Sequence, residues 1–305
     1  MARVAERRGL VFGVAAYVIW GLFPLYWPLL EPSGAVEILA HRIMWSLLAV
    51  LIMLAWGRHW IRGLTWRRAG LLAGAAIVIT VNWGTYIWSV NSGHTIEAAL
   101  GYFINPLVSV VFGVLIFRER LRRWQWAAVG LGACAVVVLT AGYGRPPWVA
   151  LVLAMAFGLY GLFKKFADMP SVESLAVETA VMFLPALAFT VALEARGDAA
   201  FGHEGVWHML LMAGGGVITA VPLLLFNGAA TRLPLSTIGM LQYLAPVLQF
   251  LIGLLVQREE MPAGRWAGFL LVWAALVVLT WDGLRARRHG RLGFGASVEP
   301  EIAKH

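Results

Sequence analysis

Five ionisable side chains lie inside long apolar stretches of this 305-residue sequence. They are Glu37, His41, Arg42, Glu97 and Glu178. A charge in an apolar helix is costly, so such groups are rare unless they face one another, a water-filled space or a bound molecule. Each of the five is therefore a candidate for either proton chemistry or a structural ion pair.

Glu37 and His41 give the sharpest of these signals. They are four residues apart, so at 3.6 residues per turn they share one face of a helix, with Arg42 beside them. A Glu–His pair can take up and release a proton, and burial and a neighbouring cation tune that exchange. Two interpretations stay open: a proton exchanged during transport, or a structural ion pair of Glu37 with Arg42 or with a neighbouring helix.

Glu97 and Glu178 have a simpler alternative explanation. Glu97 follows Thr95, a suitable N-cap residue, and Glu178 lies near the start of an apolar stretch. A carboxylate at either place is favoured by the positive end of a helix. Glu178 also matches Glu37 in an internal repeat, so a proton-coupling or ion-pair role is predicted for it as well.

Helix-disrupting residues recur at corresponding places in the two halves of the chain. Gly101 and Pro106 interrupt one apolar stretch, and Gly239 and Pro246 interrupt another. Paired Gly/Pro interruptions are a good sequence indicator of a transport site, although they could equally serve helix packing. We interpret them as helix breaks that act as gates. The polar and aromatic side chains predicted to line the solute site are Trp20, Asn82, Trp83, Tyr102, Asn105, Tyr160, Gln242 and Tyr243.

Composition shows which elements must position these residues. The chain is 60% hydrophobic and 13% charged, whereas soluble domains have about 45–50% apolar and about 25% charged residues. Its apolar residues come in runs of the length that a helix needs to cross a bilayer. A soluble protein is thereby excluded. Ten spans are predicted: 9–30, 36–56, 70–91, 97–117, 124–142, 147–166, 174–193, 205–231, 235–256 and 265–283.

The basic residues indicate how the spans are oriented. The net charge is +8, and nineteen of the 24 Lys and Arg fall in the segments on one side of the ten spans, against four on the other. The positive-inside rule then places both termini in the cytoplasm. The excess of basic residues is therefore explained by membrane topology, and no nucleic-acid partner is expected.

The sequence echoes itself at an offset of 140 residues. Pro106 falls on Pro246 and Arg118 falls on Arg258, among other matches across five spans. Because five is odd, the second half enters the membrane from the opposite side, so the repeats are inverted, an arrangement common in secondary transporters. We predict a first repeat at 1–143, a second at 144–284 and a basic cytoplasmic tail at 285–305. A duplication kept only for packing is the alternative.

Other chemistries lack their motifs. No strand–GxxxxGK[ST]–helix element is present, so this chain holds no ATP-binding domain. His203, Glu204 and His208 miss the metal-binding HExxH spacing, and the lone Cys134 has no activating neighbour. No metal or other cofactor is expected. A membrane enzyme acting on a lipid-linked substrate, or a channel, is the remaining alternative to a transporter.

Five segments resemble the RarD branch of the EamA family, in the drug/metabolite transporter superfamily. They are AYVIWG at 16–21, EILAHR at 37–42, LGYFINPL at 100–107, FGLYG at 157–161 and LSTIG at 235–239. The resemblance implies ten helices in two inverted five-helix repeats, a bacterial inner-membrane location and export. The branch is tied to chloramphenicol sensitivity, but its physiological solutes are poorly defined.

We therefore expect an all-α, ten-helix secondary transporter that is not an enzyme. Its partners are predicted to be a small organic solute, amphipathic or aromatic, and the lipid bilayer, with the chain acting as a monomer. The two halves would rock about a cavity lined by spans 1, 3, 4, 6, 8 and 9, with proton coupling as one energy source.

Overall fold

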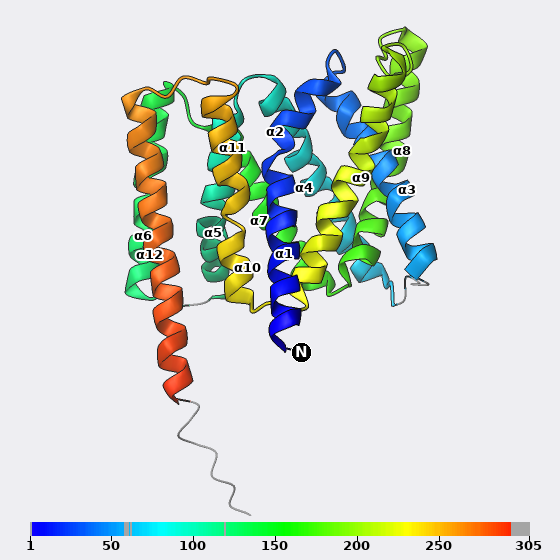
Figure 1. Cartoon of the computed structure of the whole chain (residues 1–305). Coiled ribbons are helices and arrows are strands. Elements are labelled where there is room, and N and C mark those ends of the chain that lie inside the picture. Colours follow the sequence, from blue (N-terminus) through cyan, green and yellow to red (C-terminus); the bar gives the residue numbers. More distant parts are fainter. Residues whose placement is uncertain (1, 58–60, 62, 119, 294–305) are drawn as a thin grey trace, which may run out of the picture. The chain divides into compact units, whose positions relative to one another are not determined.

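The computed structural model describes residues 2–57, 61, 63–118 and 120–293. Throughout these residues the regular structure is helical and contains no strand (Figure 1). The helices are α1 (Ala2–Gly21), α2 (Phe23–Tyr26), the 3-10 helix η1 (Trp27–Leu30), α3 (Ala35–Gly57), α4 (Trp66–Asn91), α5 (Thr95–Phe117), α6 (Arg123–Tyr143), α7 (Trp148–Ala167), α8 (Ser171–Arg196), α9 (Gly205–Ala230), α10 (Leu235–Leu241), α11 (Leu244–Leu255) and α12 (Ala263–Gly293).

These helices confirm the all-α class. In the described part of the chain, nine segments are long and apolar enough to cross a membrane, and α1 with α2 and η1 makes a tenth. The predicted ends shift by a few residues, most of all at α12, which continues ten residues past position 283 to Gly293. Of the predicted basic segments, Arg58, Arg62 and residues 294–305 lie outside the described residues.

The first span bends by 42° between Gly21 and Phe23, and prolines account for the bend. In a continuous helix the Trp20 carbonyl would accept from residue 24 and the residue 24 carbonyl from residue 28, but both are prolines without an N–H. Glutamine side chains supply the missing donors. Gln249 Nε2 lies 3.2 Å from the Trp20 carbonyl oxygen, and Gln257 Nε2 lies 3.3 Å from that of Pro24.

The helices form two compact units, each built from both halves of the sequence. The first contains α1 to α4, α5 as far as Asn105, and α7 to α11. In this unit α3 packs on α8 and α9, α4 packs on α7, and α1 packs on α9 and α11 (Figure 1). The candidate site residues that the sequence predicted all belong to the first unit, apart from Pro106.

The second unit is an antiparallel pair, α6 and α12, with the part of α5 that begins at Pro106. Glycine lets the pair approach closely, since a Cβ on Gly264 would lie 3.2 Å from the Cα of Gly142. An ion pair between an exposed arginine and a buried aspartate joins the other end, where Arg122 Nη2 lies 2.6 Å from Asp282 Oδ2.

Backbone geometry repeats at the 140-residue offset. Arg118 and Arg258 both adopt the left-handed backbone conformation, with φ of 54° and 55°. Residues with side chains seldom adopt this conformation, so its occurrence at two matched positions agrees with an internal repeat.

Candidate functional site

Arg42 is buried in the core of the first unit, among aromatic rings. Its guanidinium carbon Cζ lies 3.9 Å from the ring centroid of Trp83, 5.2 Å from that of Trp27 and 5.6 Å from that of Phe23. Its Nε donates to Thr219 Oγ1 at 2.9 Å. We call these five residues, drawn from α3, α4, η1, α2 and α9, the guanidinium cluster.

No carboxylate neutralises Arg42 within the described residues. Its one hydrogen bond there uses Nε, so the two terminal nitrogens have neither a hydrogen-bond nor an ion-pair partner. The side chains that interact electrostatically with it are those of Tyr102, Tyr86 and Tyr26. Arg42 is only 4% exposed, and a buried charge without a counterion is expensive, so this arrangement calls for an explanation.

A hydrogen-bonded pair adjoins the cluster. Tyr102 donates to Asn82 Oδ1 at 3.1 Å, and Asn82 Nδ2 donates to the carbonyl of Leu153 at 3.0 Å, which joins α5, α4 and α7. From Tyr102 the rings continue along α7, with centroids 6.1 Å apart for Tyr102–Phe157 and again for Phe157–Tyr160. A line of aromatic side chains therefore leads away from Arg42.

That line ends at a buried carboxylate. Glu178 Oε1 lies 2.8 Å from Lys164 Nζ and 2.7 Å from Ser174 Oγ, and Glu178 Oε2 accepts from the Tyr160 hydroxyl at 3.1 Å. Lys164 also donates to Ser174. We call these four residues the carboxylate cluster. It ties α7 to α8.

The two clusters lie at comparable depths from opposite helix ends. Arg42 is seven residues from the start of α3, and Glu178 is seven residues from the start of α8. At 1.5 Å per residue each cluster is about 10 Å from the end of its helix. These helices are the second and seventh spans, so they begin on opposite sides of a ten-span chain.

Glu37 and His41 hold a connecting loop. The Glu37 carboxylate accepts from the backbone N–H groups of Ala200 and Phe201, at 2.9 and 3.0 Å, in the segment between α8 and α9. His41 stacks on the Phe201 ring, with centroids 4.2 Å apart. The structure does not pair Glu37 with Arg42, so the predicted ion pair between them is absent from the described residues.

Two further carboxylates also bind backbone N–H groups of other segments. Glu97 accepts from Val149 N at 3.0 Å, at the start of α7 rather than of its own helix. Glu259, which the sequence analysis passed over, accepts from Thr95 N at 2.5 Å and Ile96 N at 3.1 Å, at the start of α5. A helix N-terminus leaves such N–H groups without intrahelical partners, so each carboxylate supplies an acceptor to them.

The predicted helix breaks differ between the two halves. The ninth span divides at Gln242 and Tyr243, and Pro246 lies in the first turn of α11, where no N–H is needed. Contrary to the prediction, α5 does not divide at Pro106 but continues as one helix. The proline costs one backbone hydrogen bond, whereas a full break in an apolar layer would expose several polar groups. The gating roles stay predictions.

Gly101 and Gly239 differ in their surroundings. A Cβ on Gly101 would lie 2.8 Å from both the Ala150 carbonyl oxygen and Leu153 Cβ, so this glycine allows α5 to contact α7. A Cβ on Gly239 would meet nothing within 4 Å.

Gly101→Ala should therefore lower the free energy of unfolding by about 1–3 kcal/mol, through forced separation of α5 and α7. Gly239→Ala, the matched control, should leave it unchanged or raise it by up to about 1 kcal/mol through helix propensity. Denaturant unfolding in detergent micelles measures both. Equal effects of the two substitutions would contradict this assignment.

The other predicted lining residues are dispersed in the first unit. Trp20 packs its ring on Tyr17 and Phe226, with centroids 5.3 and 5.9 Å apart. Gln242 and Tyr243 form the helix break, and Gln242 is exposed there. Asn105 lies one turn beyond Tyr102 on α5. Of the eight predicted lining residues, the structure thus gathers Asn82, Trp83, Tyr102 and Tyr160 along one route.

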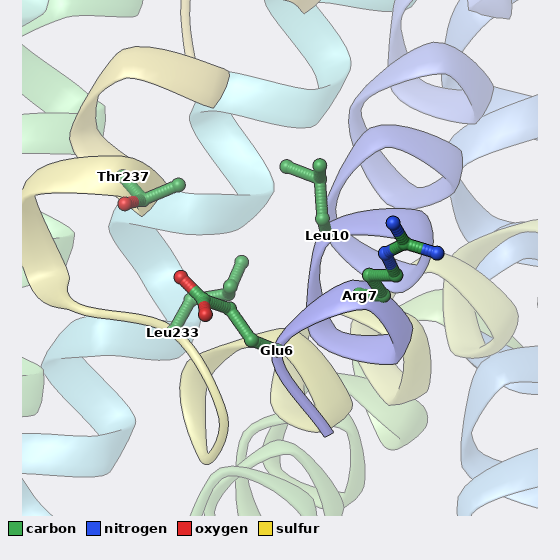
Figure 2. A pocket seen from close by; sticks show the side chains of 5 residues that line it. All are labelled: Glu6, Arg7, Leu10, Leu233 and Thr237. Atoms are coloured by element: carbon green, nitrogen blue, oxygen red, sulfur yellow. The ribbon is translucent and has the colours of Figure 1, made fainter. Parts of the chain in front are cut away.

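A pocket of about 380 Å³ lies elsewhere, where α1 begins. Glu6, Arg7 and Leu10 of α1 line it together with Leu233 and Thr237 (Figure 2). None of the predicted site residues line it. The described residues also contain no group of three His, Cys, Asp or Glu side chains able to hold a metal ion.

Several residues of both clusters escaped the sequence analysis, namely Phe23, Trp27, Lys164, Ser174 and Thr219. Lys164 was counted only as a basic residue of an inner connector. Ser174 lies four residues before Glu178, and this spacing could have indicated that the two share one face of a helix. The aromatic residues carried no such signal, because rings at span ends also serve as membrane anchors.

Known proteins with similar sequences agree with this architecture. The model of the EamA-like transporter family matches residues 7–141 and again 146–281, in keeping with two repeats. Protein RarD of Streptomyces exfoliatus is 58% identical over 98% of this chain and 96% of its own. The uncharacterized transporter YojE of Bacillus subtilis is 42% identical over 94% of this chain and 98% of its own.

A solved crystal structure supports the fold alone. It has a TM-score of 0.59 and 20% identity, and the match covers 93% of this chain and 99% of that one. The matching family and YojE are named as transporters, in line with the prediction that the chain is not an enzyme. The chain therefore belongs to the RarD branch of the EamA-like transporter family and is a multi-pass membrane transporter of the drug/metabolite superfamily.

Proposed function

We propose that this protein exports a small organic solute across the bacterial cytoplasmic membrane by alternating access. The observation that carries the proposal is the route in the first unit from the guanidinium cluster through Tyr102, Phe157 and Tyr160 to the carboxylate cluster. Aromatic rings offer apolar contact to a solute, and hydroxyl and amide groups between them offer hydrogen bonds. An amphipathic or aromatic solute suits such a route.

The clusters would serve as the two ends of the route. On the charge-derived orientation, the guanidinium cluster lies toward the outside and the carboxylate cluster toward the cytoplasm. The Lys164–Glu178 pair joins α7 to α8, so it must separate if those helices part to admit solute from the cytoplasm. Inverted repeats make an outer and an inner gate structurally related, as alternating access requires.

We further propose that Glu178 is the proton-coupling group. Backbone N–H groups of other segments hold the carboxylates of Glu37 and Glu97 in place. Glu178 instead faces side chains that can move, those of Lys164 and Tyr160 on α7 and of Ser174 on its own helix. A proton on Glu178 would cancel its attraction for Lys164 and favour opening. His41 stays the alternative.

Membrane topology gives a direct check on this scheme. Single cysteines placed at position 2 and at Gly144, in a variant with Cys134→Ala, are expected to react with a membrane-impermeant maleimide from opposite sides of the membrane. Five spans separate these positions, and five is odd. Labelling of both from the same side would rule out inverted five-helix repeats.

Transport itself is tested with the purified protein in liposomes. The wild type is expected to show saturable solute flux that responds to an imposed pH step. The Glu178→Gln variant should keep flux driven by the solute gradient but lose the response to pH. Unsaturable conduction would indicate a channel instead. Product formation without net flux would indicate an enzyme.

A further inference from the structure

We propose that Arg42 is the anchor for an anionic group on the solute, and that this group is a carboxylate attached to an apolar or aromatic body. The inference rests on the proposed transport function, which by itself leaves the charge of the solute open. It follows from three features of the guanidinium: its missing counterion, its one free edge and its aromatic surroundings.

Arg42 has no counterion among the described residues. Arg42 is buried, and its electrostatic neighbours in the described residues are hydroxyl groups rather than carboxylates. The carboxylates on nearby helices are engaged elsewhere, Glu37 with the loop between α8 and α9 and Glu178 with Lys164. Burial without a partner is costly in the resting protein. A solute anion would recover that cost only while it is bound.

The free edge indicates the shape of the anion. Trp83 covers a face of the guanidinium at 3.9 Å, and Thr219 takes the Nε position. The edge formed by the two terminal nitrogens is the part left without a hydrogen bond. Its parallel N–H groups match the two oxygens of a planar carboxylate.

The surroundings indicate what carries the anion. Phe23 and Trp27 flank the guanidinium, and the rings of Tyr86 and Tyr102 lie 5.6 Å apart beside it. A ring-bearing or aliphatic body would pack on them as the carboxylate pairs with Arg42.

Paired probes test the inference on the purified full-length protein. The probes are four ring-bearing carboxylates, among them 3-phenylpropanoate, each compared with its neutral amide by calorimetric titration. Wild-type protein should bind at least one acid about tenfold more tightly than its amide, since a charge-assisted bidentate pair is lost in the amide. In Arg42→Gln the two should bind within about twofold of each other, because neither then meets a charge.

Two further variants keep the result interpretable. Arg42→Lys retains the charge without the fork, so its preference for the acid should fall to about threefold. Arg232→Gln is the matched control, because Arg232 also lies over a ring, that of Phe12 at 5.6 Å, but is exposed; it should keep the wild-type preference. If Arg42→Gln fails to fold, the wild-type preference and the Arg42→Lys result decide.

The results of the binding and flux measurements distinguish the role of Arg42 from the proposed transport function. Equal binding of acid and amide by the wild type, an unchanged preference in the Arg42 variants, or no binding of any of the acids overturns the role of Arg42. Saturable flux of the neutral amides with no preference for the acids would leave transport standing and remove the anchor. Binding with the expected preference but without flux would support the anchor and contradict the proposed transport.

Discussion

Lys164→Met is expected to lower the free energy of unfolding by about 3 kcal/mol, because it leaves the Glu178 carboxylate buried without its ammonium partner. The Glu178 side chain is only 2% exposed, and Lys164 Nζ lies 2.8 Å from its Oε1. Once the lysine is lost, the hydroxyl groups of Ser174 and Tyr160 are the remaining donors to that carboxylate in the described residues. Hydroxyl donors offset only part of the cost of burying a full charge.

Replacing Glu178 instead of Lys164 should lower the free energy of unfolding by less. In Glu178→Gln the amide oxygen can accept from one of the two hydroxyl groups and the amide nitrogen can donate to the other. The Lys164 side chain, which is 21% exposed, can turn toward water. The double variant Lys164→Met/Glu178→Gln removes both charges and should be more stable than Lys164→Met alone. Unfolding in mixed micelles with increasing SDS measures all three, and a coupling free energy near zero would contradict a buried pair.

An exposed contact between a histidine and a glutamate provides the control. His203 Nε2 lies 3.1 Å from Glu194 Oε1, with side chains 60% and 59% exposed. Glu194→Gln should change the free energy of unfolding by less than about 1 kcal/mol, since water and salt screen such a pair. The contrast between the two pairs isolates burial as the source of the larger effect.

The fold could be predicted from sequence because bilayer thickness and hydropathy constrain it strongly. A run of about 20 apolar residues has few alternatives to a spanning helix, and Lys and Arg counts order the connectors. The bend in the first span was missed, although Pro24 and Pro28 were present, because a proline alone does not tell whether a helix breaks. Pro106 is the opposite case: a break was predicted there, but α5 continues through it.

Side-chain partners across helices were the least predictable part of the site. Closeness in sequence made a pairing of Glu37 with Arg42 one of the open alternatives. Instead, Glu37 binds backbone N–H groups between α8 and α9, and Arg42 faces rings from three other segments. Such contacts join residues about 160 apart in the chain in the case of Glu37. Helical periodicity determines which residues share a face but not which helix that face meets.

Glu37→Leu is expected to destabilise the protein by about 3 kcal/mol, because it leaves two backbone N–H groups without their acceptor. Those groups belong to Ala200 and Phe201, and Ala200 is buried. In Glu37→Gln the remaining side-chain oxygen can still accept from both, so the loss should be about 1 kcal/mol, the difference between a charged and a neutral acceptor. The same micellar unfolding measurement applies.

Transport by the Glu37→Gln protein separates the structural role from a proton-coupling one. A carboxylate that only holds the loop between α8 and α9 can be replaced by an amide with little change in flux, and the response to a pH step should match that of the wild type. Glu178→Gln, assayed in parallel, should lose that response. If instead Glu37→Gln lost it and Glu178→Gln kept it, the proton would bind on α3, where His41 lies one turn away and stacks on the same loop through Phe201.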